Sequence, residues 1–303
     1  MVASLHPVFT PVELEIRLVW ARLDRAEEQA KSFGESWARY LDDHPHSLEH
    51  VDEEDGTRTV RLHRHQPLPV VLSILLGEML YELRAALDNC LYAVAALVSG
   101  ENPPPNAGRL EWPIRSTPAE WKAQSGRYRA LPTAIVTALE AIQPYQAEYP
   151  DWNSLAILHE LARIDRHRSM HGLGLYLAHI YMKADRREIE VLDRGKPRIV
   201  RHGDSIVRLQ LGDGAVLTPE NFDLQLEFEV DVDGVRESTG PGGVTGRPWG
   251  PLEKRLASLV VAAREYTTGL LNIAADLVGE PARRPPSEES AARKIEGLPT
   301  PSS

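Results

Sequence analysis

The sequence has very little cysteine and no long apolar run, and each shortage excludes a class of protein. Cys90 is the single cysteine among 303 residues, so no disulfide can form within the chain. No apolar run approaches the roughly 18 residues that a membrane-spanning helix needs. The N-terminal stretch lacks the basic segment and apolar core of a secretion signal. We therefore predict a cytoplasmic protein without a membrane partner, with Cys90 packed on an apolar helix face.

Basic residues are also scarce, since 34 lysines and arginines are outnumbered by 44 acidic residues and the formal net charge is −10. Broad electrostatic binding of nucleic acid usually requires a basic domain, so the charge argues against it. A local basic patch can still bind an anionic partner. Two such stretches are present, RLHRH at 61–65 and HELARIDRHRSMH at 159–171.

Hydrophobic periodicity predicts an α+β fold. Apolar residues at helical spacing predict helices over about 12–42, 71–98, 131–142, 153–171 and 250–278, with a shorter helix over about 117–125. Partly alternating residues predict a β-hairpin over about 47–65 and further strands over about 175–232, with turns at GDG and DVDG. The segment ESTGPGGVTGRPWG is expected to be a loop, and the tail 280–303, rich in proline, serine and charge, is expected to be disordered.

These elements predict a single α+β domain over residues 1–279. Its core is a helical bundle, with an inserted β-hairpin and an antiparallel β-sheet segment before the C-terminal helix. One domain is favoured over two because the sheet segment lies between helices that need each other's apolar faces.

The segment 159–171 is the densest polar stretch in the chain. On a helix that begins after Asn153, four basic residues descend one side at steps of four residues. They are His159, Arg163, His167 and His171.

Asp165 falls on the apolar side of the same helix, where a carboxylate needs a partner. Arg84, at the edge of the apolar face of the 71–98 helix, is the natural candidate. Asp88 and Arg168 would form the reciprocal pair. We therefore expect these two helices to be neighbours.

Several functions are compatible with these residue types. His167 and His171 have the spacing of two metal ligands, but no glutamate follows the first histidine and the nearby arginines repel cations, so we expect no metal and no cofactor. Arg166 and His171 form an R-x4-H spacing, in which an arginine stabilises phosphate and a histidine exchanges protons. The basic arc could also bind an acidic partner or a phosphate backbone. It could equally be a solvated helix face without a specific role.

Three stretches, LLGEMLYELRAALDNCLYAVA, LEWPI and LHELARIDRHRSMH, resemble a family of uncharacterised bacterial and phage-associated proteins. That family has an LRxALDH helix, an FPI-like segment, a QPY-like turn and a DKHR helix, and the resemblance extends over most of residues 10–278. LRxALDH is itself similar to the R-x4-H signature of HEPN proteins, helical bundles that often cut RNA in defence or toxin systems, usually as dimers. The resemblance implies that Arg84 is the arginine of this R-x4-H signature. Asn89 stands where the histidine would be and cannot exchange protons near neutral pH.

The leading hypothesis is an HEPN-like homodimer that binds RNA or cuts it without metal, in phage defence or as a toxin. Its candidate catalytic residues are Arg166, His171, His167 and Arg84, and its candidate binding residues are His159, Arg163, Asp165, Arg168, Asp88 and Asn89. The alternative is a non-catalytic structural or protein-interaction module, with these residues in a buried network between helices. Two distant helices would exclude the first hypothesis, and enclosed histidines would favour the second.

Overall fold

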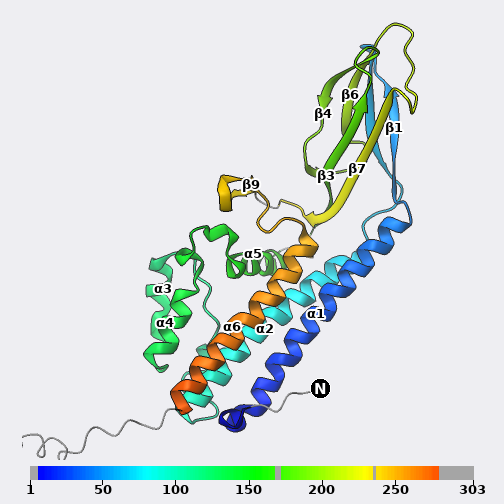
Figure 1. The fold of residues 1–303 in the computed structure, drawn as a ribbon. Helices are drawn as coiled ribbons and strands as arrows, with labels where there is room; N and C mark the ends of the chain where they lie inside the picture. The colour runs from blue at the N-terminus through cyan, green and yellow to red at the C-terminus, as the bar shows by residue number, and fades with distance from the viewer. Residues whose placement is uncertain (1–5, 168–171, 235–236, 280–303) are drawn as a thin grey trace, which may run out of the picture.

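The computed structural model describes residues 6–167, 172–234 and 237–279, with the backbone alone for residues 164–167. It contains a bundle of long helices and an arm of β strands at one end of the bundle (Figure 1). The chain is thus an α+β protein, as the residue patterns predict. No helix in these described ranges has the length and apolar character needed to cross a membrane.

Three long helices, α1 (Glu13–Asp42), α2 (Val70–Ser99) and α6 (Leu252–Gly279), form the bundle. Their buried residues recur at helical spacing, which gives each helix an apolar face. The apolar face of α2 is the widest, because α2 packs against α1, α6 and a fourth helix, α5 (Ser154–His167). Helix α2 ends before Gly100, whose φ of 71° is the left-handed conformation that glycine adopts without steric cost.

Shorter helices cover one side of the bundle (Figure 1). They are α3 (Pro118–Gln124) and α4 (Thr133–Ala141), together with α5, whose first turn is capped by Asn153 as predicted. The Asn153 side-chain oxygen accepts hydrogen bonds from the backbone N–H groups of Leu155 at 2.9 Å and Ala156 at 3.3 Å. A 3₁₀ helix, η1 (Pro7–Val12), precedes α1, and shorter 3₁₀ turns lie between later elements: η2 (Ala107–Arg109), η3 (Ser125–Tyr128), η4 (Pro144–Gln146), η5 (Pro150–Trp152) and η6 (Pro241–Gly243).

The predicted hairpin and the predicted sheet segment join in one arm (Figure 1). One sheet has the order β1-β2-β6-β4, all antiparallel, with β1 (His46–Asp52), β2 (Thr57–Arg64), β6 (Ser205–Leu211) and β4 (Ile189–Arg194). The second sheet has the order β5-β3-β7, with β5 (Arg198–Val200), β3 (Leu173–Ala184) and β7 (Phe222–Val232). The segment predicted as a loop contains one further pair, β8 (Ser238–Thr239) and β9 (Thr245–Gly246).

Aromatic contacts join the two sheets of the arm. The His46 ring of β1 meets the Phe228 ring of β7 edge to face, with 4.3 Å between centroids, and His50 meets Phe222 in the same way at 6.3 Å. Alternate residues of a strand point to opposite faces of a sheet. Apolar residues on one face of each sheet are therefore buried inside the arm, among them Val60 of β2, Val207 of β6 and Val230 of β7.

The bundle core contains the single cysteine. Cys90 is fully buried on α2, and burial raises the pKa of its thiol far above the ordinary value. Its Sγ lies 3.7 Å from the Thr267 carbonyl oxygen of α6. The predicted packing of Cys90 on the apolar face of the helix is confirmed by its complete burial.

Candidate functional site

Arg84 and Asp88, one turn apart on α2, both contact the backbone of Trp112. The Trp112 N–H donates to Asp88 Oδ1 at 2.7 Å, and Arg84 Nη2 donates to the Trp112 carbonyl oxygen at 3.4 Å. The guanidinium and carboxylate lie 3.6 Å apart, and only 13% of the Arg84 side chain is exposed. The Trp112 indole is buried in the core. These two motif residues therefore dock the LEWPI segment on α2.

Gln143 completes the docking from the other side of the segment. Its side chain is fully buried, and its Nε2 donates to the carbonyl oxygens of Pro113 at 3.1 Å and Leu139 at 2.7 Å. Its Oε1 accepts from the Arg115 N–H at 2.8 Å. Residues of the α2, LEWPI and QPY stretches thus meet in one polar arrangement that orders a loop.

The basic arc of α5 begins at the protein surface. His159 and Arg163 are both exposed, and Arg163 forms an ion pair with Glu160 at 2.8 Å. The hydrogen bond that Arg163 donates to Glu160 raises the pKa of the Arg163 guanidinium. An exposed pair of this kind contributes little to stability. On α2, Asn89 is partly buried, and its Nδ2 has no hydrogen-bond partner among the described residues.

The rest of the predicted α5 site lies outside the described side chains. The structure describes only the backbone of Asp165, Arg166 and His167, which lie in α5. Arg168 and His171 fall outside the described residues altogether. The predicted ion pairs from this segment to α2 stay predictions. Helix α5 does pack against α2, so the two motif helices are neighbours, as expected. Within the described ranges, no three histidine, cysteine or acidic side chains are grouped closely enough to hold a metal ion.

A second polar cluster, which the sequence patterns do not reveal, lies where the arm meets α6. Asp231 of β7 is fully buried and accepts hydrogen bonds from Arg247 Nη1 at 2.6 Å and Arg255 Nη1 at 3.2 Å. Glu229 accepts from Arg247 Nη2 at 2.6 Å, and the Arg247 guanidinium lies over the Tyr176 ring, 3.7 Å from its centroid. Burial acts to lower the pKa of Arg247, but its hydrogen bonds to Glu229 and Asp231 outweigh burial and raise it.

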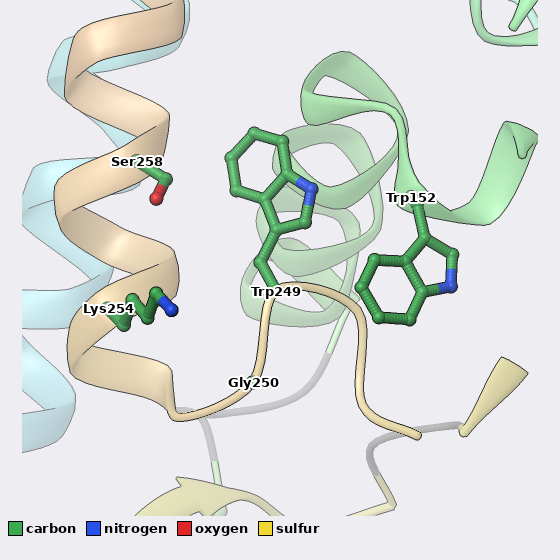
Figure 2. Close-up of a pocket in the computed structure, with 5 residues that line it drawn as sticks. All are labelled: Trp152, Trp249, Gly250, Lys254 and Ser258. Carbon is green, nitrogen blue, oxygen red and sulfur yellow. The ribbon is translucent and has the colours of Figure 1, made fainter. Parts of the chain in front are cut away.

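Two tryptophans form an open pocket beside this cluster (Figure 2). Its volume is about 440 Å³, and its walls come from η5, the loop before α6 and the first turns of α6. The lining residues are Trp152, Trp249, Gly250, Lys254 and Ser258. Figure 2 shows Trp249 between α6 and Trp152, with Lys254 and Ser258 carried by α6.

Sequence reasoning misses this pocket because its residues are spread over distant segments. Trp249 lies in RPWGP, a glycine- and proline-rich stretch that predicts only a loop. Asp231 falls in DVDG, which predicts a turn, although it lies inside β7. The usable signal is a tryptophan inside a polar loop, where an indole has no obvious core to fill.

Comparisons with protein-family models, with curated protein sequences and with solved structures found no match for this chain.

Proposed function

We propose that this chain is a non-catalytic binding module whose polar motif residues build its fold. The observation that carries the proposal is the double contact of Arg84 and Asp88 with the Trp112 backbone. A guanidinium that docks a backbone segment and is largely covered is not placed to approach an RNA phosphate. Replacing Arg84 would remove one of the two side-chain contacts that hold the Trp112 backbone on α2.

Two further features support binding without catalysis. Asn89 stands where the HEPN resemblance would require a histidine, and an amide does not exchange protons near neutral pH. Gln143, fully buried in the same arrangement, forms hydrogen bonds only to backbone groups of the loop and of α4 in the described structure. The motif stretches therefore share a structural task.

The test measures cleavage and stability on the same variants. The parent protein, incubated with RNA with and without EDTA, is expected to leave the RNA intact. Asp88→Ala is expected to lower the free energy of unfolding by about 1–3 kcal/mol, because it leaves the buried Trp112 N–H without its acceptor. Glu160→Ala is the matched control, since this exposed carboxylate pairs with Arg163 at the surface and its loss is expected to cost less than about 1 kcal/mol.

RNA cleavage by the parent that survives EDTA and disappears in folded Arg166→Ala or His171→Ala would overturn this proposal. It would establish the second candidate function, metal-independent RNA cleavage from α5. The observation that favours this second candidate is the packing of α5 against α2, which brings both R-x4-H-type helices together. In that mechanism His167 or His159 would be the second proton-transfer group, and Arg84 would support the site from α2.

A further inference from the structure

The pocket between the two tryptophans has the volume of a small-molecule site and is open to solvent. Its volume of about 440 Å³ falls within the range of roughly 300–1,000 Å³ that ligand pockets occupy. Both indoles are only partly buried, so apolar ring surface remains accessible beside α6.

Trp249 is held in a strained backbone conformation. Its φ of 60° is left-handed, which is costly for a residue with a bulky side chain. The surrounding loop is fixed on both sides: Arg247 is bound to Asp231, and Arg255 donates to the carbonyl oxygens of Pro248 at 3.0 Å and Gly250 at 2.8 Å. The fold thus uses a buried ionic cluster to hold the backbone that carries one partly exposed indole, and a fixed backbone is one part of a preorganised binding site.

The second indole is also placed by close packing. Gly240 lies against the ring of Trp152, where even a methyl group on residue 240 would overlap the indole. Gly240 has an ordinary φ of −118°, so its role is to leave room and not to permit an unusual backbone. A ring that a neighbouring backbone supports on one side is a rigid stacking surface.

The polar groups of the pocket favour an anion. Lys254, in the first turn of α6, brings an ammonium group close to the positive end of the helix dipole, and Ser258, one turn further along α6, brings a hydroxyl. The one acidic residue in the first turn, Glu253, is directed toward Gly34 of α1, away from the pocket lining. A cationic ligand would be repelled by Lys254, so the pocket is not an aromatic cage for an ammonium group.

We infer that this pocket binds a nucleoside phosphate, with the base against the indoles and the phosphate at Lys254 and Ser258. Indole faces stack on any nucleobase, and a lysine ammonium binds phosphate as a point charge. The same chemistry is offered by a free nucleotide and by an unpaired nucleotide of an RNA strand. The inference rests on the proposed function in one respect, that the chain binds this ligand without transforming it.

Calorimetric titration of the full chain with AMP, adenosine and a short unpaired oligoadenylate tests the inference. AMP is expected to bind more tightly than adenosine, because only AMP carries the phosphate. Trp249→Leu is expected to weaken AMP binding roughly tenfold, in line with the loss of one stacked base. Trp249→Phe, which keeps a ring, should retain most of the affinity.

The phosphate end is tested by Lys254→Gln, which should weaken AMP binding but leave adenosine binding unchanged. Lys183→Gln is the matched control, because Lys183 is an exposed lysine of β3, outside the pocket. Circular dichroism and urea unfolding identify any variant that has lost its fold.

Tighter binding of AMP than of the oligonucleotide identifies a free nucleotide as the ligand, and the reverse order identifies an RNA strand. No AMP binding, equal affinity for AMP and adenosine, or unchanged AMP affinity in both Trp249→Leu and Lys254→Gln would overturn the inference. So would exclusive binding of a proline-rich peptide, which aromatic grooves also accept. Recovery of intact oligonucleotide after the titration tests the proposed function separately, since cleavage would contradict that proposal without changing the affinities of the pocket variants.

Discussion

Among the acidic side chains that the structure describes, Asp231 is the one that is fully buried. Its carboxylate lies between two guanidiniums, Arg247 at 2.6 Å and Arg255 at 3.2 Å, and Arg255 is itself only 2% exposed. Ionic groups taken out of water need each other, because each has lost its hydration. The cluster joins β7 to the loop that carries Trp249, so it links the arm, the pocket and α6 through one carboxylate.

Asp231→Asn is therefore expected to lower the free energy of unfolding by about 3–5 kcal/mol, since it leaves the buried Arg255 without its carboxylate partner and Arg247 with Glu229 alone. Urea unfolding followed by circular dichroism measures the change. Asp24→Asn is the control, because Asp24 is exposed and pairs with Arg264 at the surface, where such pairs contribute at most about 1 kcal/mol. Equal losses in the two variants would show that burial does not determine the strength of the Asp231 cluster.

The candidate site could be predicted only as far as helical spacing extends. Arg84 lies at the border of the α2 apolar face, where helical spacing places it, and Asn153 caps α5, as expected from its residue type. The contact of Arg84 with the Trp112 backbone could not be predicted, because a backbone carbonyl in a loop has no side-chain signature. The Trp249 pocket could not be predicted for a related reason, since it depends on a left-handed backbone conformation that a tryptophan rarely adopts.

The helices follow the sequence closely, because their period is set by neighbours three and four residues apart. Helix α1 is predicted from 12 to 42 and runs Glu13–Asp42, and α2 is predicted from 71 to 98 and runs Val70–Ser99. Strand partners are different, since pairing joins residues far apart in the chain. The hairpin β1–β2 is predicted, but its extension by β6 depends on contacts such as Val60 with Val207 that no local pattern specifies.

Strand β1 also gives the arm a dependence on pH. Burial lowers the pKa of His46 below its ordinary value of 6.5, and the nearby charges of His65, Arg64 and His44 lower it further. The folded arm therefore binds this proton less well than the unfolded chain does. The stability that neutral His46 contributes is complete above its ordinary pKa of 6.5 and is lost as the pH falls through the lowered pKa of the folded arm.

We expect the urea midpoint of the parent to fall between about pH 7.5 and about pH 5, and His46→Gln to reduce that fall. His6→Gln serves as the control, since His6 is exposed near the start of the chain, away from the arm. A His46→Gln protein with the same pH dependence as the parent would assign the effect to other groups, such as His50, whose pKa is also lowered by burial.

The molecule as a whole is assembled by a chain that passes four times between the bundle and the arm. The passages lie between α1 and β1, β2 and α2, α5 and β3, and β7 and α6. Hydrogen bonds join the first two passages, from the His65 N–H to the Pro45 carbonyl at 2.8 Å and from the Tyr40 hydroxyl to the Gln66 carbonyl at 3.1 Å. The Asp231 cluster joins the fourth passage to α6. Each part of the fold therefore contains residues from both halves of the sequence.

Because of this interleaving, we expect the fold to survive a single break in the chain, with the two fragments held together by their shared core. The turn after β1 ends at Gly56, an exposed residue with a φ of 79°, and a break before it leaves α1 on the fragment 1–55 and α2 on the fragment 56–303. Because α1 buries residues such as Ile16, Leu23 and Phe33 in the shared core, the two fragments should co-purify through a tag on the larger one and separate only in denaturant. Loss of the small fragment on washing would contradict this expectation. If the fragments stay together, the hairpin tip is a position where a reporter or a second protein can be inserted without dividing the fold.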